Sequence, residues 1–384
     1  MSSAERSSQP LAVSMLAPTR ERCGIGDYSR LLVAALRALP EISGVEVVST
    51  PEGAARTGSL SALRNYLSDE QRYRALGEQL NAADIAHIQH QYFFFGGVAP
   101  HKNHFGAVLN AVRVPIVLQV HEIADGGSVG WKRALIEHTN RRNFVHPAIR
   151  QIVVHTQADA ERLRRIGVPD SQLTVLPLAV PPALPFANRD AAREALGLSG
   201  KRVLLMFGFL SGKKGHLLAL DALKMVPEDV VLLLAGEQHS DDASDYVVRL
   251  KEAIAAHCLE RRVQITGYLP SEQVPRVMAA ADLAIAPFLE SSGSASLAHL
   301  LAYGLPVLAS DIPPHRELLA ASPGSLALFP AGNAEAMGEQ INTLLGNVSL
   351  RISFQEGAAR FCAHHSFAHI ARETLQIYRR AMWD

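Results

Sequence analysis

Two neighbouring lysines in the second half of the chain have the spacing of a phosphate-binding loop. Lys213 and Lys214 follow the apolar stretch 203–207 and the glycine-containing turn 208–212. An ammonium group in such a turn can neutralise a diphosphate and the charge that develops on it as it leaves. A solvated loop of charge would contain the same two residues. The pattern favours an anion site, because the lysines stand directly after a strand-like stretch.

A run of serine and glycine lies at a second position of this kind. Ser292, Gly293 and Ser294 separate the apolar stretch 283–287 from the helix expected over 295–302. Several backbone N–H groups are free at a helix start, and the helix dipole favours an anion there. The hydroxyls could equally cap the helix. Together with the lysine loop, the run predicts a site for a nucleotide diphosphate.

Short apolar stretches must supply the strands that position these loops. In the first half, strands are expected at 11–16, 45–49, 84–90, 115–120, 151–155 and 173–178. In the second half, they are expected at 203–207, 230–235, 263–266, 283–287 and 307–310. Segments with helical spacing alternate with them, which is typical of two doubly wound parallel sheets in an α/β protein. Ligands of such sheets bind beyond the carboxyl ends of the strands.

The segment 180–185 divides the two series of strands. Its three prolines (VPPALP) hold the backbone in extended conformations, as expected of a linker. We therefore expect one domain over residues 1–182 and a second over 186–365, with the ligand in the cleft between them. The stretches 334–345 and 350–384 are expected to be helical.

Composition excludes several classes of function. The chain has 37 basic and 37 acidic side chains, and this neutrality argues against a general nucleic-acid binder. Cys23, Cys258 and Cys362 have no metal-ligand spacing and are typical of free thiols in a reducing cytoplasm. The polar N-terminus lacks the apolar core of a signal peptide, and no apolar run approaches the ~20 residues of a transmembrane helix. We therefore expect a cytoplasmic protein.

A glycine pair follows the first expected strand. Gly24 and Gly26 are expected in the loop before the helix 28–39. The pattern matches the start of a dinucleotide fingerprint, but Ser29 stands where the third glycine would be. A Rossmann dehydrogenase is therefore a weak alternative, and a plain tight turn is another.

Two further polar residues follow strands of the first half. His121 ends the stretch 115–120, and Gln91 follows 84–90. A lone histidine in an apolar strand is more often structural than functional. The aromatic run 92–95 beside Gln91 could contact a substrate or pack in the core.

The motifs of residues 202–318 resemble the donor-nucleotide domain of the retaining GT-B glycosyltransferases of family 4, the group 1 type. Lys214 matches the lysine of that family, and the segment 301–311 (LAYGLPVLASD) is close to its Ala-x-Gly-x-Pro-Val signature. The resemblance over 11–178 is weaker but consistent. Two family positions differ: Phe209 replaces an arginine, and a pair of glutamates falls on Ser291 and His299.

The resemblance implies a GT-B fold with two Rossmann-like domains facing a cleft and a C-terminal helix, about 366–384, that crosses back onto the first domain. It implies that the donor diphosphate is bound by Lys213, Lys214, Ser292, Gly293 and Ser294. It assigns the nucleotide or ribose to His299 and Glu237, the reacting sugar to His121 and Glu290, and the acceptor side of the cleft to Gly24, Gly26 and Gln91.

The activity implied by the resemblance is transfer of a sugar from a nucleotide-sugar donor, with retention at the anomeric carbon. The acceptor would be a glycan or a lipid-linked glycan of bacterial polysaccharide biosynthesis, and neither a metal nor another cofactor is expected. Two alternatives use the same fold. One is a non-catalytic subunit that binds a partner glycosyltransferase, and the other is a nucleotide-sugar epimerase.

A basic segment, 131–150, suggests a further partner. It carries five cationic side chains and one carboxylate, with Trp131 and other apolar residues interleaved. Such a segment could lie on an anionic membrane at the inner face of the bilayer. A solvated helix face is the simpler interpretation.

Overall fold

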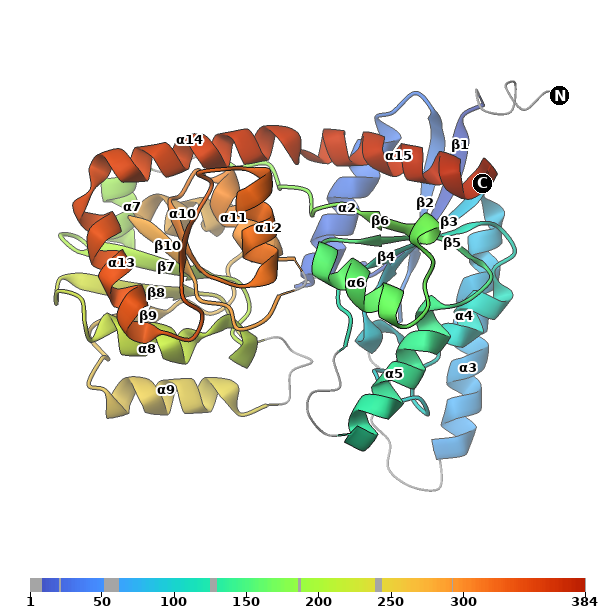
Figure 1. Ribbon diagram of the computed structural model, residues 1–384, viewed down its shortest axis with the longest axis horizontal. Helices are drawn as coiled ribbons and strands as arrows, with labels where there is room; N and C mark the ends of the chain where they lie inside the picture. The colour runs from blue at the N-terminus through green and yellow to red at the C-terminus, as the bar shows by residue number, and fades with distance from the viewer. Residues whose placement is uncertain are drawn as a thin grey trace. The chain divides into compact units, whose positions relative to one another are not determined.

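The structure is a computed structural model that describes residues 9–20, 22–51, 62–124, 130–185, 188–238, 244–291 and 293–383. The chain divides into two compact units. The first comprises Met1–Ala179 together with Phe367–Asp384, and the second comprises Val180–Ser366. The ribbon in Figure 1 shows the strands and helices of each unit.

The first unit is built on a six-stranded sheet in which every neighbouring pair of strands is parallel. In sheet order, the strands are β2 (Ile42–Ser49), β1 (Leu11–Ala17), β3 (Ile85–His90), β4 (Ile116–Val120), β5 (Ile149–Val154) and β6 (Leu173–Val175). The helices are α2 (Gly24–Arg37), α3 (Ala62–Gln79), α4 (Phe105–Ala111), α5 (Gly130–Phe144), α6 (Gln157–Arg165) and α15 (Phe367–Trp383).

Both faces of this sheet are apolar, because alternate residues of each strand point to opposite sides. Ile88 and Leu118 belong to the core cluster on one face, whereas Met15 and Val117 belong to the cluster on the other. The second cluster also contains residues of α2 and of the C-terminal helix α15, which pack against each other. The last helix therefore completes the core of the unit that begins the chain.

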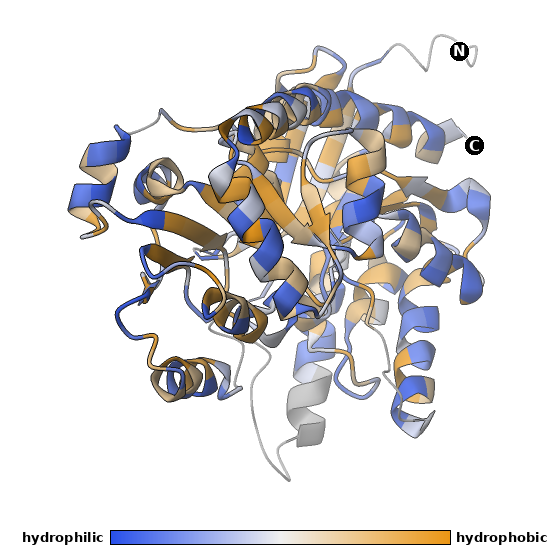
Figure 2. Cartoon of the chain, turned by 60° about the vertical axis from the view of Figure 1, so that its left-hand side comes forward, coloured by the Kyte–Doolittle hydropathy of each residue, from blue (hydrophilic) through white to orange (hydrophobic). Residues whose placement is uncertain are grey.

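The second unit repeats the architecture with another six-stranded parallel sheet. In sheet order, its strands are β12 (Ala327–Phe329), β11 (Val307–Ser310), β10 (Leu283–Ala286), β7 (Arg202–Phe207), β8 (Val230–Ala235) and β9 (Val263–Ile265). Its helices are α7 (Arg189–Ala195), α8 (His216–Leu223), α9 (Tyr246–Ala256), α10 (Val274–Ala280), α11 (Ala295–Ala302), α12 (Pro313–Ala321), α13 (Ala334–Gly346) and α14 (Val348–His364). Figure 2 shows apolar residues concentrated on the strands.

The strand order identifies the place where each sheet can bind a ligand. In the second sheet the chain runs outward from β7 through β8 to β9, and outward on the other side from β10 to β12. In the first sheet the corresponding reversal lies between β1 and β3. Loops that follow two such neighbouring strands diverge and leave a crevice, which is the usual ligand site of open α/β sheets.

The predicted α/β architecture is confirmed, and several element boundaries are corrected. Helix α2 begins at Gly24 rather than at residue 28, so Gly24 and Gly26 lie in its first turn and not in a loop. The C-terminal stretch is helical, as expected, and α15 begins within one residue of the boundary expected at about residue 366. The short elements α4 and β12 were not expected from the sequence, because neither is long enough to show a clear periodicity.

Candidate active site

The lysine loop lies at the carboxyl end of β7, directly beside the point where the strand order reverses. Gly208 directly follows the strand and has φ +109°, and Gly215 ends the loop with φ +72°. A Cβ on Gly215 would lie 2.0 Å from the carbonyl oxygen of Pro287, so the loop packs against the end of β10. The backbone N–H of Leu289 also donates to the carbonyl of Lys213 at 2.9 Å. The two loops predicted to bind phosphate are therefore in contact.

Lys214 reaches from this loop to the first turn of α11. Its Nζ donates a hydrogen bond to Ser296 Oγ at 2.9 Å and lies 4.0 Å from the centre of the Phe288 ring. A Cβ on Gly208 would lie 2.2 Å from the same serine oxygen, so glycine is required beside the pair. Burial lowers the pKa of Lys214 to about 8. The side chain is thus held where helix-start N–H groups are also available to an anion.

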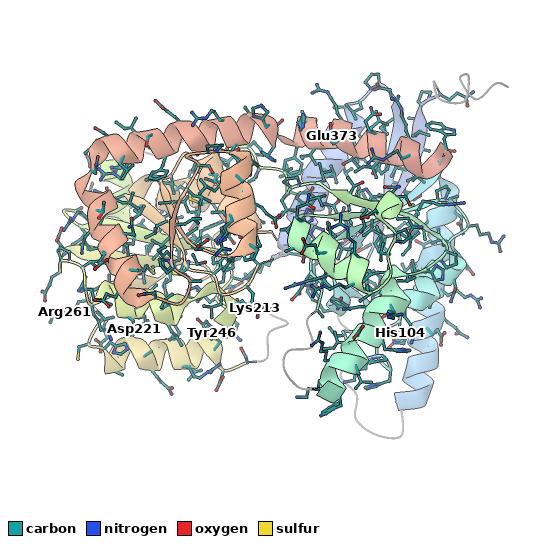
Figure 3. All side chains as sticks on the ribbon, in the orientation of Figure 1. His104, Lys213, Asp221, Tyr246, Arg261 and Glu373 are labelled. Atoms are coloured by element: carbon teal, nitrogen blue, oxygen red, sulfur yellow. The ribbon has the colours of Figure 1, made fainter. Side chains whose placement is uncertain are left out.

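Lys213 has a different environment from Lys214. It is exposed, and its Nζ lies 3.7 Å from Glu290 Oε2, which is exposed as well. Figure 3 labels Lys213, which comes from the loop after β7. Exposed ion pairs of this length contribute little stability, so Lys213 can exchange the carboxylate for another anion. The two lysines therefore differ in their surroundings, and Glu290 is paired with Lys213.

The serine run forms the start of α11. Ser294 is the N-cap residue, and its Oγ accepts a hydrogen bond from the backbone N–H of Leu297 at 3.1 Å. Gly293 has φ +100°, and its carbonyl accepts a hydrogen bond from Ser291 Oγ at 3.1 Å. Ser292 lies outside the described residues. The capping interpretation thus applies to the Ser294 hydroxyl, which binds one N–H group of the first turn. The start of the helix remains the positive end of its dipole.

His299 and Glu237 lie on the same edge of the second sheet. The ring of His299, on α11, is 5.3 Å from that of Phe207 at the end of β7, and its Nδ1 donates to the carbonyl of Ala295 at 2.8 Å. Glu237 follows β8, and its carbonyl accepts a hydrogen bond from the N–H of Leu210 at 2.8 Å. His299 lies within the helix expected over 295–302, and Glu237 lies in the loop after β8.

His121 follows β4 in the first unit and belongs to a network of buried polar side chains. Its Nε2 lies 2.5 Å from Gln89 Oε1, and Gln89 Nε2 donates to Gln119 Oε1 at 3.1 Å. Gln119 Nε2 in turn donates to the hydroxyl of Tyr28 at 3.1 Å. His87 Nε2 contacts Gln119 Oε1 at 3.1 Å. The imidazole of His121 is therefore oriented by side chains of β3 and β4.

Burial keeps the histidines of this network uncharged. It lowers the pKa of His87 and of His155 to about 4, and it holds the pKa of His121 well below its usual range. The ring of His155, just after β5, lies 5.2 Å from that of His121, and its Nδ1 donates to the carbonyl of Leu176 at 2.9 Å. Sequence reasoning missed His155, although its position directly after a strand was the same signal that selected His121.

The remaining candidates of the first unit flank its own point of strand-order reversal. Gln91 follows β3, and its side chain donates to Glu122 Oε2 at 2.7 Å and accepts from the N–H of Tyr92 at 2.7 Å. A Cβ on Gly26 would lie 3.0 Å from the carbonyl oxygen of Pro18, whereas one on Gly24 would meet nothing within 4 Å. Of these two glycines, Gly26 is therefore the one that another part of the backbone approaches closely.

The aromatic run after Gln91 is mostly structural. Tyr92, Phe94 and Phe95 are buried in the first core, and Phe93 is exposed. Within the described part of the chain, no group of three or more histidine, cysteine or acidic side chains is arranged to hold a metal ion. Across the same residues, no helix is both long and apolar enough to cross a membrane.

Comparison with known protein families identifies the family of this chain. Residues 13–179 match the glycosyl transferase 4-like domain, and residues 188–361 match glycosyl transferases group 1. The chain belongs to the group 1 glycosyltransferases. This glycosyltransferase is 26% identical to alpha-maltose-1-phosphate synthase of Mycolicibacterium smegmatis, over 93% of this chain and 95% of the relative.

Other relatives cover the glycosyltransferase less completely or share the fold at lower identity. It is 28% identical to phosphatidyl-myo-inositol mannosyltransferase of Mycobacterium leprae, over 47% of this chain and 46% of that protein. The crystal structure of Anabaena HepE with UDP-glucose has a TM-score of 0.73 and 17% identity, over 96% of this chain and 99% of HepE. The GT-B fold of two parallel-sheet domains is therefore established for this chain.

Proposed function

We propose that this glycosyltransferase moves a sugar from a nucleotide-diphosphate donor to a glycan or lipid-linked acceptor, with retention at the anomeric carbon. The observation that carries the proposal is the position of Lys214. Its ammonium lies at the carboxyl edge of the second sheet, beside the start of α11, and is hydrogen-bonded to a hydroxyl. A cation and free helix-start N–H groups at one point are suited to a departing diphosphate.

The first unit supplies groups suited to hydroxyls rather than to phosphate. His121 and His155 are neutral imidazoles, held by side chains or backbone carbonyls of their own unit. Neutral imidazole can accept a hydrogen bond from a sugar hydroxyl without attracting an anion. In the proposed reaction, His121 orients the sugar while the bond between the sugar and the leaving diphosphate breaks. The leaving diphosphate then takes the proton of the acceptor hydroxyl that attacks the sugar.

UDP-glucose is the first donor to test. HepE has been crystallised with UDP, with UDP and glucose, and with UDP-glucose, and it shares the fold of this chain. We infer a nucleotide-sugar donor of this chemical class. The proposed contacts to its nucleotide are His299, on α11, and Glu237, after β8, because both lie beside the lysine loop.

Binding and product analysis test the proposal together. Calorimetry with UDP-, GDP- and ADP-sugars should find one donor that saturates the wild-type protein, and Lys214→Ala should weaken it by about 10²-fold or more. Nuclear magnetic resonance of the glycoside should then show the anomeric configuration of the donor. Absence of binding at millimolar concentration for every donor would refute the catalytic proposal, and an inverted product would refute retention alone.

We further propose that α5 brings the enzyme to an anionic membrane from the cytoplasmic side. Trp131 and Leu135 are one helical turn apart, and their side chains are 65% and 45% exposed. Lys132 and Arg133 beside them are exposed as well, as are two arginines near the end of the helix. Exposed apolar residues among cations suit the interface of an anionic bilayer.

Vesicle binding tests the membrane proposal independently of the reaction. The enzyme should sediment with vesicles containing phosphatidylglycerol and much less with phosphatidylcholine alone. A Trp131→Ala, Leu135→Ala variant should lose most of this binding, whereas Val248→Ala, an exposed residue of the second unit, should retain it. Equal sedimentation of the two variants would show that α5 is only a solvated helix.

A further inference from the structure

Lys214 has no carboxylate as its partner among the described residues. The groups that contact its Nζ are the Ser296 hydroxyl, at 2.9 Å, and the Phe288 ring, at 4.0 Å. Burial is the cause of its shifted pKa, with no contribution from an acidic side chain. Glu290, on the adjacent loop, pairs with Lys213 instead. A cation held by a hydroxyl and an aromatic face keeps its full attraction for a further anion.

Two histidines close to Lys214, His216 and His315, are uncharged near neutral pH. His216, on α8, contacts the hydroxyl of Tyr246 at 3.0 Å through its Nδ1, and His315, on α12, donates its Nδ1–H to the carbonyl of Ser310 at 2.7 Å. Burial lowers the pKa of each histidine to about 4, and the charge of Lys214 adds to the effect. The two histidines therefore add no charge beside Lys214.

The carboxylates of the neighbouring elements are engaged elsewhere. Asp311, after β11, pairs with Arg316 on α12, and Glu290 pairs with Lys213. Asp221, labelled in Figure 3, lies on α8 and pairs with Lys224. Each of these pairs is at the surface of the unit, and none contributes to the pKa of Lys214.

We propose that Ser296 and Phe288 are positioning residues that hold the Lys214 ammonium without a counter-ion, so that the donor diphosphate becomes its counter-ion and its binding takes up a proton at Lys214. The inference rests on the proposed function, because it assigns the diphosphate to this place. It adds residues that the family motifs do not mark, and it makes donor binding depend on pH in a defined direction.

The sign follows from the two states of the lysine. In the free enzyme the pKa of Lys214 is about 8, so above this pH the amine is largely neutral. A bound diphosphate stabilises the ammonium and raises its pKa. Binding therefore takes up a proton above about pH 8, and the affinity falls by up to about tenfold per pH unit. Near pH 6.5 the lysine is already protonated, and no uptake is expected.

Calorimetry with UDP at pH 8.8 tests the proton uptake. Titrations in two buffers of different ionisation enthalpy should give an uptake approaching one proton in the wild-type enzyme and close to none at pH 6.5. Lys214→Arg is the matched control, because its guanidinium stays protonated and should bind UDP without uptake at either pH. An uptake that persists in Lys214→Arg would overturn the assignment to Lys214.

The positioning residues are tested by two further variants and by a measurement that needs no ligand. Ser296→Ala should weaken the binding of UDP by about threefold to tenfold, and Phe288→Leu by about fivefold, because each variant removes one of the two groups that hold the ammonium. Competitive labelling with acetic anhydride from pH 6 to 11, read by mass spectrometry, should place the midpoint of Lys214 near pH 8. Phe288→Leu should move this midpoint to lower pH, because it removes the aromatic face that stabilises the ammonium.

The outcomes separate the two proposals. A midpoint near pH 10.5 in the wild-type enzyme would overturn the unpaired ammonium, even if UDP binds and the proposed function stands. A midpoint near pH 8 without binding of UDP, GDP or ADP would overturn the diphosphate assignment and the proposed function together. Unchanged UDP affinity in Ser296→Ala and Phe288→Leu would show that the two residues do not position the lysine.

Discussion

The carboxyl edges of the two sheets have the same geometry but opposite chemistry. The first edge carries neutral imidazoles and amides, including His121, His155 and Gln89, which hydrogen-bond within their own unit. The second edge carries the ammonium of Lys214, whose contacts are a hydroxyl and an aromatic ring. The first edge, called here the neutral edge, is therefore a preorganised set of hydrogen-bonding groups. The second, called the charged edge, is a site of positive charge.

In the proposed reaction, this difference divides the tasks of glycosyl transfer between the two edges. Parallel strands deliver side chains to the same edge of each sheet, so the backbone alone does not distinguish the two sites. Buried neutral groups suit the hydroxyls of a sugar, because they can form hydrogen bonds with them and need no counter-ion. A cation beside a helix start suits a diphosphate, because negative charge develops on the diphosphate as its bond to the sugar breaks.

The largest effect that we expect is a loss of kcat when His121 is removed from the neutral edge. His121→Ala should lower kcat by about 10²–10³-fold and leave donor binding within about threefold, because the diphosphate is held by the other edge. Steady-state kinetics with the donor found by calorimetry would measure both values. His364→Ala, at an exposed position of α14, should match the wild type. A loss of donor affinity comparable to the loss of kcat would contradict the proposed division.

Gly215 tests how rigidly the charged edge is built. Gly215→Ala must adopt φ near +72° and place a Cβ 2.0 Å from the Pro287 oxygen, whereas Gly197, with φ +68°, has nothing within 4 Å of its Cβ position. We expect Gly215→Ala to lower the free energy of unfolding by about 3 kcal/mol and Gly197→Ala by about 1 kcal/mol. Urea unfolding followed by circular dichroism measures both.

Equal losses in the two glycine variants would contradict close packing at this edge. They would show that positive φ alone accounts for the cost, since that is the property the two positions share. Hydrogen exchange of the peptides around β10 would locate the effect, because the opposing carbonyl belongs to that part of the second unit.

The sequence predicted the backbone of both edges better than it predicted their contacts. Apolar stretches with clear ends located β7 and β10, and the loops that follow them were therefore found. The first turn of α2 was missed, because glycine has a low helix propensity even though a helix start tolerates it. Elements as short as β12 leave too few residues for a periodic signal.

The partners of the site residues could not be predicted, because they come from distant parts of the chain. Lys214 was selected from its position in a loop, but its contact with Ser296 requires the fold. The pairing of Glu290 with Lys213 likewise joins two loops that are distant in the sequence. His155 was overlooked because it was counted as the end of a strand, although in the fold its ring lies beside His121.

Acid should destabilise the neutral edge. In the unfolded chain a histidine takes up a proton below about pH 6.5, whereas His87 and His155 in the folded unit stay neutral until about pH 4. Unfolding therefore binds protons between these values, and stability falls with pH by up to about 1.4 kcal/mol per pH unit for each histidine. Between pH 7 and 5 we expect a loss of about 2–4 kcal/mol.

Tryptophan fluorescence during urea unfolding measures this loss in the first unit. Both tryptophans of the chain, Trp131 and Trp383, belong to that unit. His155→Gln should reduce the dependence on pH, because one of the buried titrating groups is removed. A stability that is constant from pH 7 to pH 5 would show that the histidines are not held neutral by the fold.

The smallest expected effect concerns the link between the neutral edge and the C-terminal helix. The hydroxyl of Tyr378, on α15, lies 2.6 Å from His87 Nδ1, and the side chain is fully buried. Tyr378→Phe removes this hydroxyl and leaves the imidazole nitrogen without its partner, which should cost about 1–2 kcal/mol of unfolding free energy. Trp383 on the same helix reports the change by fluorescence. If Tyr378→Phe unfolds at the same urea concentration as the wild type, α15 is held by its apolar contacts alone, and the polar network ends at His87.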